Sequence, residues 1–127
     1  MALYADIIEI VAPAEAAAGS RVDITVKIKN TYASAIGIMV SGALEYGVTP
    51  WPGIDFPTNW ANVPGGATQP FSGYFIMPDK KVTIHAYSYY YADGSWYFDD
   101  ELTKVVNLTA AIPSQFGSIE ITGYAKV

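Results

Sequence analysis

A lone histidine is the residue best suited to acid–base chemistry in this sequence. His85 lies between Ile84 and Ala86, within a long apolar and tyrosine-rich run. A serine hydrolase would have to be built around it, yet Ser88 would only share its face of a strand, and no nucleophile-elbow motif is present. We therefore interpret His85 as an outward-facing residue of a sheet, and we expect the protein not to be an enzyme.

Acidic side chains are the second group that could do chemistry, because carboxylate oxygens are the ligands that calcium prefers. Their spacing does not match an EF-hand loop, and no second acidic pair faces them for glycoside hydrolysis. The alternative is that Asp93 makes a turn and the three acidic residues at 99–101 solubilise a sheet edge. The calcium candidates are Asp93, Asp99, Asp100 and Glu101. We expect no other cofactor, since one histidine and no cysteine leave no transition-metal site.

Aromatic residues make up 14% of the chain and offer a third kind of chemistry, binding through flat apolar rings. If Val82, Ile84 and Ala86 face a core, every second residue from Thr83 to Tyr91 lines the opposite face of the strand. An exposed patch of this kind marks an interface, although cross-strand aromatic pairs also stabilise sheets. The candidates for a protein interface or for glycan stacking are Trp51, Phe56, Trp60, His85, Tyr87, Tyr89 and Tyr91.

The strand that is clearest in the sequence runs from Arg21 to Lys29, where apolar and polar residues alternate strictly. A shorter apolar run at 6–11 predicts a first strand at a sheet edge. A third strand is predicted over 36–46, with a bulge near Gly42. The segment 47–70 holds five prolines and predicts a long, proline-stiffened loop of the kind that is often functional.

Later strands are predicted over 71–77 and 81–91. Asp93-Gly94 then indicates a tight hairpin that returns through 96–98, and strand character resumes at 102–108 after the acidic run. Residues 110–127 predict a connector followed by an extra strand at 118–127, which either pairs within its own sheet or crosses to a neighbouring subunit. With about seven to nine strands and no helix, we expect one all-β domain over 1–127, an immunoglobulin-like antiparallel β-sandwich.

Three stretches, over 14–30, 77–84 and 93–100, resemble CARDB-type and related immunoglobulin-like modules of bacterial surface proteins and bacteriophage virion proteins. The resemblance covers about residues 14–106 and rests on turn and strand signatures, which are evidence of fold more than of function. It implies adhesion, spacing or decoration, usually outside the cell, and it brings no catalytic residues. Such modules commonly occur in tandem within long secreted proteins, whereas we expect this one to stand alone without a signal peptide, a departure that favours a virion component over a fragment of an adhesin.

The net charge of −5 restricts the classes of partner, because it opposes binding to nucleic acid or to an anionic membrane surface. We expect neither partner, and no apolar stretch is long enough to span a bilayer. The leading hypothesis is a structural assembly protein of a phage virion or extracellular filament, forming homo-oligomers or larger assemblies. The alternative is a carbohydrate-binding or adhesion module that stacks sugars on its Trp and Tyr rings.

Overall fold

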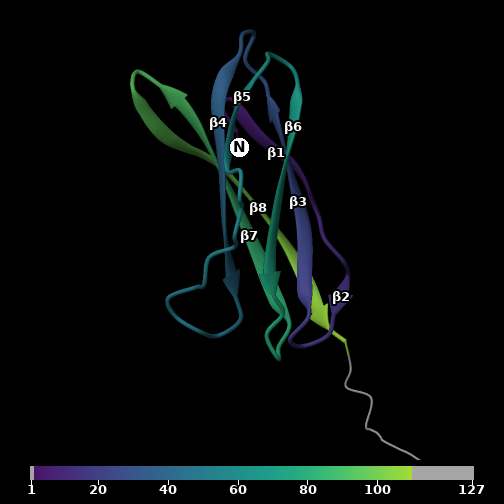
Figure 1. Cartoon of the computed structure of the whole chain (residues 1–127). Helices are drawn as coiled ribbons and strands as arrows, with labels where there is room; N and C mark the ends of the chain where they lie inside the picture. Colours follow the sequence, from purple (N-terminus) through teal and green to yellow (C-terminus); the bar gives the residue numbers. More distant parts are fainter. Residues whose placement is uncertain (1, 110–127) are drawn as a thin grey trace, which may run out of the picture.

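A computed structural model describes residues 2–109 and shows eight strands in that part of the chain, with no helix among them (Figure 1). The strands are β1 (Ala5–Val11), β2 (Glu15–Ala16), β3 (Arg21–Asn30), β4 (Ile36–Glu45), β5 (Trp60–Val63), β6 (Thr68–Ile76), β7 (Val82–Ala92) and β8 (Ser95–Leu108). The predicted all-β class is confirmed. The predicted extra strand at 118–127 lies outside the described residues.

Two sheets pack face to face. The three-stranded sheet has the order β1-β3-β6, and the five-stranded sheet has the order β2-β8-β7-β4-β5. All pairings are antiparallel except that of β2 with β8. β1 begins beside the five-stranded sheet, because the hydroxyl of Ser88 donates to the carbonyl of Ala5 at 2.6 Å, and then runs along β3. This strand therefore ties the two sheets together.

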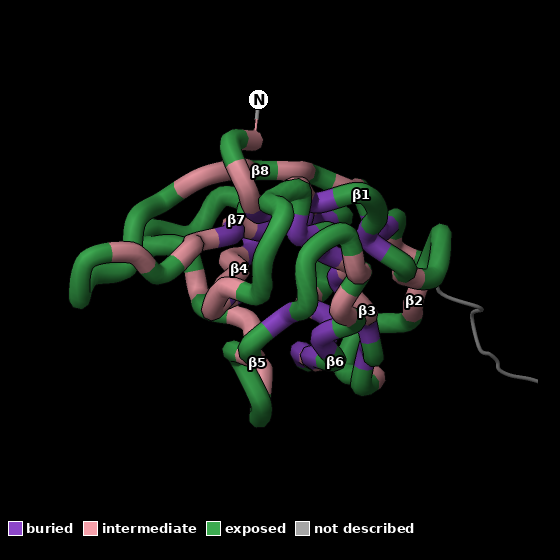
Figure 2. The backbone as a smooth tube through the Cα atoms, turned by 90° about the horizontal axis from the view of Figure 1, so that it is seen from above, coloured by how far each residue is buried: buried purple, intermediate pink, exposed green. Residues whose placement is uncertain are grey.

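The core lies between the sheets, where the buried segments of both gather (Figure 2). Alternate residues of β3 point into this core, because the side chains of Val22, Ile24, Val26 and Ile28 are buried, as the sequence predicts. β7 contributes Val82, Ile84 and Ala86, each fully buried. Burial of apolar area at roughly 25 cal/mol per Å² is the main source of stability in such a fold, since the chain has no disulfide. Among residues 2–109, moreover, there is no helix long and apolar enough to cross a bilayer.

The segment 47–70 differs from its prediction as a loop. It contains β5 and the first residues of β6, and its middle part is hydrogen-bonded to strands of both sheets. The amide of Ile54 donates to the carbonyl of Gly42 on β4, at 2.9 Å. Asp55 and Tyr74 of β6 exchange both of their backbone hydrogen bonds, at 2.9 and 3.1 Å. We call residues 52–57 the clasp, because they join an edge of one sheet to an edge of the other.

Phe56 belongs to this clasp, which explains two glycines on facing strands. A Cβ atom at Gly73 would lie 2.6 Å from the Phe56 ring, and one at Gly42 would lie 2.9 Å from Ile54 and 3.3 Å from Phe56. Phe56 is partly buried against the core, so its role as an interface candidate is corrected to one in internal packing. The predicted bulge near Gly42 is also wrong, since β4 pairs with β7 in unbroken register there.

The register shifts occur elsewhere. One lies at Ile8 in β1 and another at Asp99 in β8, so the predicted strands 96–98 and 102–108 are one strand with a bulge in its acidic run. The predicted hairpin is confirmed: Ala92 pairs with Ser95, and φ is 51° at Asp93 and 78° at Gly94. Positive φ at both central residues is the mark of the tight turn that suits the twist of two strands. The tip of this hairpin leans out from the sandwich (Figure 1).

Candidate binding surface

Aromatic side chains cover the outward face of the five-stranded sheet. On β7 the predicted alternation is confirmed as far as Ser88, because opposite residues of β7 and β8 share a face and every second β7 residue from Val82 to Ser88 is buried. Trp51, just before the clasp, and Trp60 of β5 add two tryptophans from the side of β4. We call this surface the aromatic face; its ring-bearing residues are Trp51, Trp60, His85, Tyr87, Tyr89, Tyr91, Trp96 and Phe98.

His85 is at the centre of the half of this face that lies away from the hairpin turn. Its Nδ1 lies 2.7 Å from a carboxylate oxygen of Glu101 on β8, and its Nε2 lies 2.8 Å from one of Glu45 on β4. The indole of Trp51 stacks on the imidazole at 4.5 Å between ring centres. Since both nitrogens face a carboxylate, the imidazolium form, which donates from both, suits the site best.

Protonation of His85 follows from this arrangement. Partial burial of the ring lowers the pKa of His85, but the hydrogen bonds and charges of Glu101 and Glu45 outweigh it, so that the pKa is raised above its ordinary value of 6.5. Burial also raises the pKa of Tyr87, with a further contribution from the charge of Glu101. The aromatic face is therefore held together across β4, β7 and β8 by a charged cluster.

The other half of the aromatic face, next to the hairpin turn, is built by the ends of β7 and β8 that form the hairpin. Tyr89 pairs with Phe98, and Tyr91 pairs with Trp96, with ring planes inclined by 72° and 64°. Trp60 of β5 approaches Trp96 at 6.3 Å with the planes inclined by 66°. Most of these rings therefore meet edge to face, a favourable arrangement for aromatic pairs, and they form an uneven apolar surface.

This surface is exposed to solvent. Trp60 and Phe98 are 55% and 58% exposed, and Trp51, Tyr91 and Trp96 are also exposed. All three tryptophans of the chain lie here, and none is in the core. Contiguous exposed aromatic side chains on a folded domain are typical of a surface that a partner covers.

Apart from the imidazolium of His85, the charged side chains of the aromatic face are acidic. The strand residues that point outward on β4, β7 and β8 include Glu45 and Glu101 and no lysine or arginine. The three-stranded sheet differs, since Arg21 and Lys27 lie on its outward side. A partner that covers the aromatic face should therefore be apolar with positive charge at its margin.

The four acidic calcium candidates do not come together as one site. Asp93 lies in the turn at the hairpin tip and Glu101 binds His85. Asp99 accepts from the amides of Leu3, Tyr4 and Ala5 at 2.6–2.8 Å, and Asp100 accepts from the amide of Ile7 at 3.0 Å. Within residues 2–109 no three His, Asp or Glu side chains gather as metal ligands. The bulge at Asp99 therefore serves to hold the start of β1, which corrects both sequence-based interpretations of these two residues.

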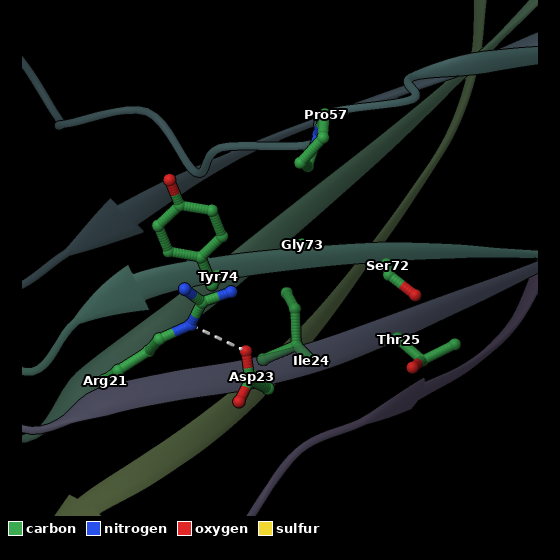
Figure 3. Close-up of a pocket in the computed structure, with 8 residues that line it drawn as sticks. All are labelled: Arg21, Asp23, Ile24, Thr25, Pro57, Ser72, Gly73 and Tyr74. Carbon is green, nitrogen blue, oxygen red and sulfur yellow. Dashed lines mark hydrogen bonds and ion pairs between the residues drawn. The ribbon is translucent and has the colours of Figure 1, made fainter.

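A serine–histidine arrangement is also absent from the described residues. Ser88 is buried on the core side of β7, where its hydroxyl donates to Ala5, whereas His85 lies on the opposite side. One hollow outside the aromatic face, of about 260 Å³, lies over β3 and β6 (Figure 3). In it the Arg21 guanidinium lies 3.9 Å from the centre of the Tyr74 ring and binds Asp23 at 2.9 Å, so its charge is already paired.

Residues of the aromatic face that the sequence interpretation missed are Glu45, Trp96 and Phe98. The hairpin contained the signal for the last two, since a two-residue turn at Asp93-Gly94 fixes Trp96 opposite Tyr91 and Phe98 opposite Tyr89. Glu45 had no such signal, because its place depends on the pairing of β4 with β7, two strands that are distant in sequence.

No known sequence family matches the chain, and no curated protein matches it. Solved structures do. A CARDB domain from Pyrococcus furiosus, in complex with di-metal ions, superposes with a TM-score of 0.57 at 10% identity, over 86% of this chain and 92% of that one. The fold is therefore a CARDB-like β-sandwich, and the resemblance inferred from the turn and strand signatures is confirmed at the level of fold.

Two larger proteins contain a similar unit. An alkylpurine DNA glycosylase from Pseudomonas fluorescens, bound to DNA containing an abasic site analogue, matches with a TM-score of 0.61 at 14% identity, over 84% of this chain and 31% of that one. A sporulation control protein from Bacillus subtilis matches with a TM-score of 0.54 at 17% identity, over 85% and 50%. At such identities the likeness concerns the fold alone.

Proposed function

We propose that this chain is a non-enzymatic assembly module whose copies associate through the aromatic face, as a subunit or decoration module of a phage virion or an extracellular filament. One observation carries the proposal. The aromatic face exposes Trp60, Trp96 and Phe98 together, although the core of the sandwich is complete without them. Exposure of so many rings to water is unfavourable, and a neighbour that covers them lowers the free energy.

Ring orientation favours a protein neighbour over a sugar. A sugar stacks on a flat ring whose face is open, whereas the rings of Trp60, Tyr91 and Phe98 meet their neighbours at 59–72°. Edge-to-face packing leaves ridges and hollows between the rings. Such a surface is complementary to apolar side chains of another protein, which interdigitate with it.

The outward side of the three-stranded sheet is the part of a second copy that suits the aromatic face. It carries Arg21 and Lys27 near the exposed apolar side chains of Val11 and Ile76. The two cations bind Asp23 and Glu9 in exposed pairs, which are worth about 0–1 kcal/mol and exchange readily for Glu45 and Glu101 of a neighbour. Contact between unlike faces propagates from copy to copy, which gives a filament or a ring.

Sedimentation velocity on protein without a tag tests the proposal. We expect wild type to show concentration-dependent oligomers at micromolar concentration and the double variant Trp60→Ser, Phe98→Ser to be a monomer. Val48→Ser is the matched control, because Val48 is exposed but lies in the loop after β4. A wild-type protein that stays monomeric over the whole range would contradict the proposal.

Carbohydrate binding is the second candidate, and Trp51 is the observation that favours it. Its indole stacks on His85 and remains 39% exposed, with the carboxylates of Glu45 and Glu101 nearby as acceptors for sugar hydroxyls. A glycan array distinguishes the two candidates. If the monomeric protein binds glycans and Trp51→Ala abolishes this binding, carbohydrate binding would replace the assembly proposal. The di-metal ions of the Pyrococcus furiosus domain are not carried over, since residues 2–109 offer no three-ligand cluster.

A further inference from the structure

A small pocket lined by tyrosines lies beside the last residues of β7, just before the hairpin turn. It has a volume of about 170 Å³, and its lining comes from the residue before β1, the loop after β3, the first residue of β4 and the end of β7. Four of its six lining residues are tyrosines. They are Tyr4, Tyr32, Tyr90 and Tyr91, and the other two are Ile36 and Ala92.

The rings of this pocket form a box. Tyr4 meets Tyr32 at 72° with ring centres 5.1 Å apart, and it meets Tyr90 at 88° with ring centres 5.0 Å apart. Tyr97 stacks on Tyr90 at 28° and supports it from the other strand of the hairpin. Tyrosine rings from three separate segments thus line one hollow, and aromatic rings attract an alkylated cation.

The chain segments around the box carry only negative charge. Residues 2–8, 31–36 and 89–99 contain Asp6, Asp93 and Asp99 and no lysine or arginine. Asp99 lies close enough to act on the hydroxyl of Tyr90: burial raises the pKa of Tyr90, and the charge of Asp99 raises it further. A cation is thus favoured near this pocket, and an anion is opposed.

We propose that the tyrosine box binds the trimethylammonium group of a small choline-class ligand. A site for a drug-sized molecule has roughly 300–1,000 Å³, so 170 Å³ accommodates a headgroup rather than a whole large ligand. A methylated ammonium loses less hydration than a primary one and makes cation–π contacts with the surrounding rings. The nearby carboxylates disfavour a zwitterion such as glycine betaine, whose own carboxylate they repel.

NMR titration of the ¹⁵N-labelled chain with three probes tests this proposal. Choline should give saturable shifts that centre on residues 4, 32 and 90–92. The uncharged isostere 3,3-dimethyl-1-butanol and the zwitterion glycine betaine should each bind at least about fivefold more weakly, because one lacks the cation and the other adds an anion. Equal affinity for choline and its uncharged isostere would overturn the proposal, and so would equal affinity for glycine betaine.

Tyr32 is the residue to change, since it is exposed and lies outside the strands. Tyr32→Leu should weaken choline binding about fivefold, whereas Tyr32→Phe keeps the ring and should stay within about twofold of wild type. Trp60→Ser is the control for the assembly surface and should leave choline binding unchanged. Shifts that remain linear in concentration, or that are the same in Tyr32→Leu, would overturn the proposal without touching the assembly of the chain.

Discussion

The outward faces of the two sheets differ, although their inward faces build one core. On the three-stranded sheet, β3 alternates buried aliphatic residues with Arg21, Asp23 and Lys27, which form exposed ion pairs. On the five-stranded sheet, β7 alternates buried aliphatic residues with rings. The fold requires only the inward half of each pattern, so the outward half is where the two sheets are free to differ.

This difference separates the residues that the sandwich needs from those that it does not need. The polar outward face of β3 is what solvation of an antiparallel sheet demands. The rings on β7 and β8 gain some free energy from cross-strand pairing, about 0.2–1 kcal/mol a pair, but Trp60 and Phe98 remain more than half exposed. Folding does not account for their exposure, whereas the proposed association of copies would.

The largest effect is expected inside the core that both sheets share. Ile24→Ala should lower the free energy of unfolding by about 2–4 kcal/mol, because it removes buried methyl groups and leaves a cavity. Thr25→Ala, one residue along on the outward face, should change it by less than about 0.5 kcal/mol. Urea denaturation measures both, and equal losses would mean that the two faces of β3 are wrongly assigned.

The next effect concerns the clasp, which holds an edge of one sheet against an edge of the other. Gly73→Ala should destabilise by about 1–3 kcal/mol, since the new Cβ would lie 2.6 Å from the Phe56 ring. Gly53→Ala is the control, because a Cβ there would meet only the carbonyl of Gly42, at 3.9 Å. The double variant Gly73→Ala, Phe56→Ala should lose less stability than the sum of the two single losses, because the clash is absent without the ring. Additive losses would show that the Phe56 ring is not the cause.

Asp99 should show a smaller loss. Asp99→Asn replaces a carboxylate that accepts three backbone amides at the start of β1, so we expect a loss of about 1–2 kcal/mol. Hydrogen exchange of the amides of Leu3, Tyr4 and Ala5 should accelerate more than that of β3. Asp93→Asn, in the hairpin turn, is the matched control, because Asn also tolerates positive φ. Unchanged exchange at all three amides would show that the carboxylate does not hold this strand.

Sequence reasoning succeeded where the signal was local and failed where it was not. The alternation of β3 and the Asp93-Gly94 turn are each contained in a few residues, and both were predicted. The clasp depends on a ring at Phe56 meeting glycines on β4 and β6, and the binding of β1 by Asp99 spans more than ninety residues. No periodicity records such contacts, so a packing residue was interpreted as an interface candidate and a structural carboxylate as a calcium candidate.

The smallest effect on stability is a pH dependence on the aromatic face itself. Because Glu101 and Glu45 raise the pKa of His85 in the folded state, His85 contributes stability that is fully present below its unfolded pKa of about 6.5 and is lost as pH rises through the folded pKa. The difference in unfolding free energy between wild type and His85→Gln should therefore be larger at about pH 5.5 than at about pH 8.5. A difference that grows with pH would contradict the charged cluster.

Tryptophan fluorescence tests the central claim most directly, because Trp51, Trp60 and Trp96 are the only tryptophans of the chain and all lie on the aromatic face. If copies of the chain cover this face, acrylamide quenching should weaken and the emission maximum should move to shorter wavelength as protein concentration rises. Both changes should follow the mass measured on the same samples. Quenching that stays constant while the mass increases would show that assembly uses another surface and would contradict the account.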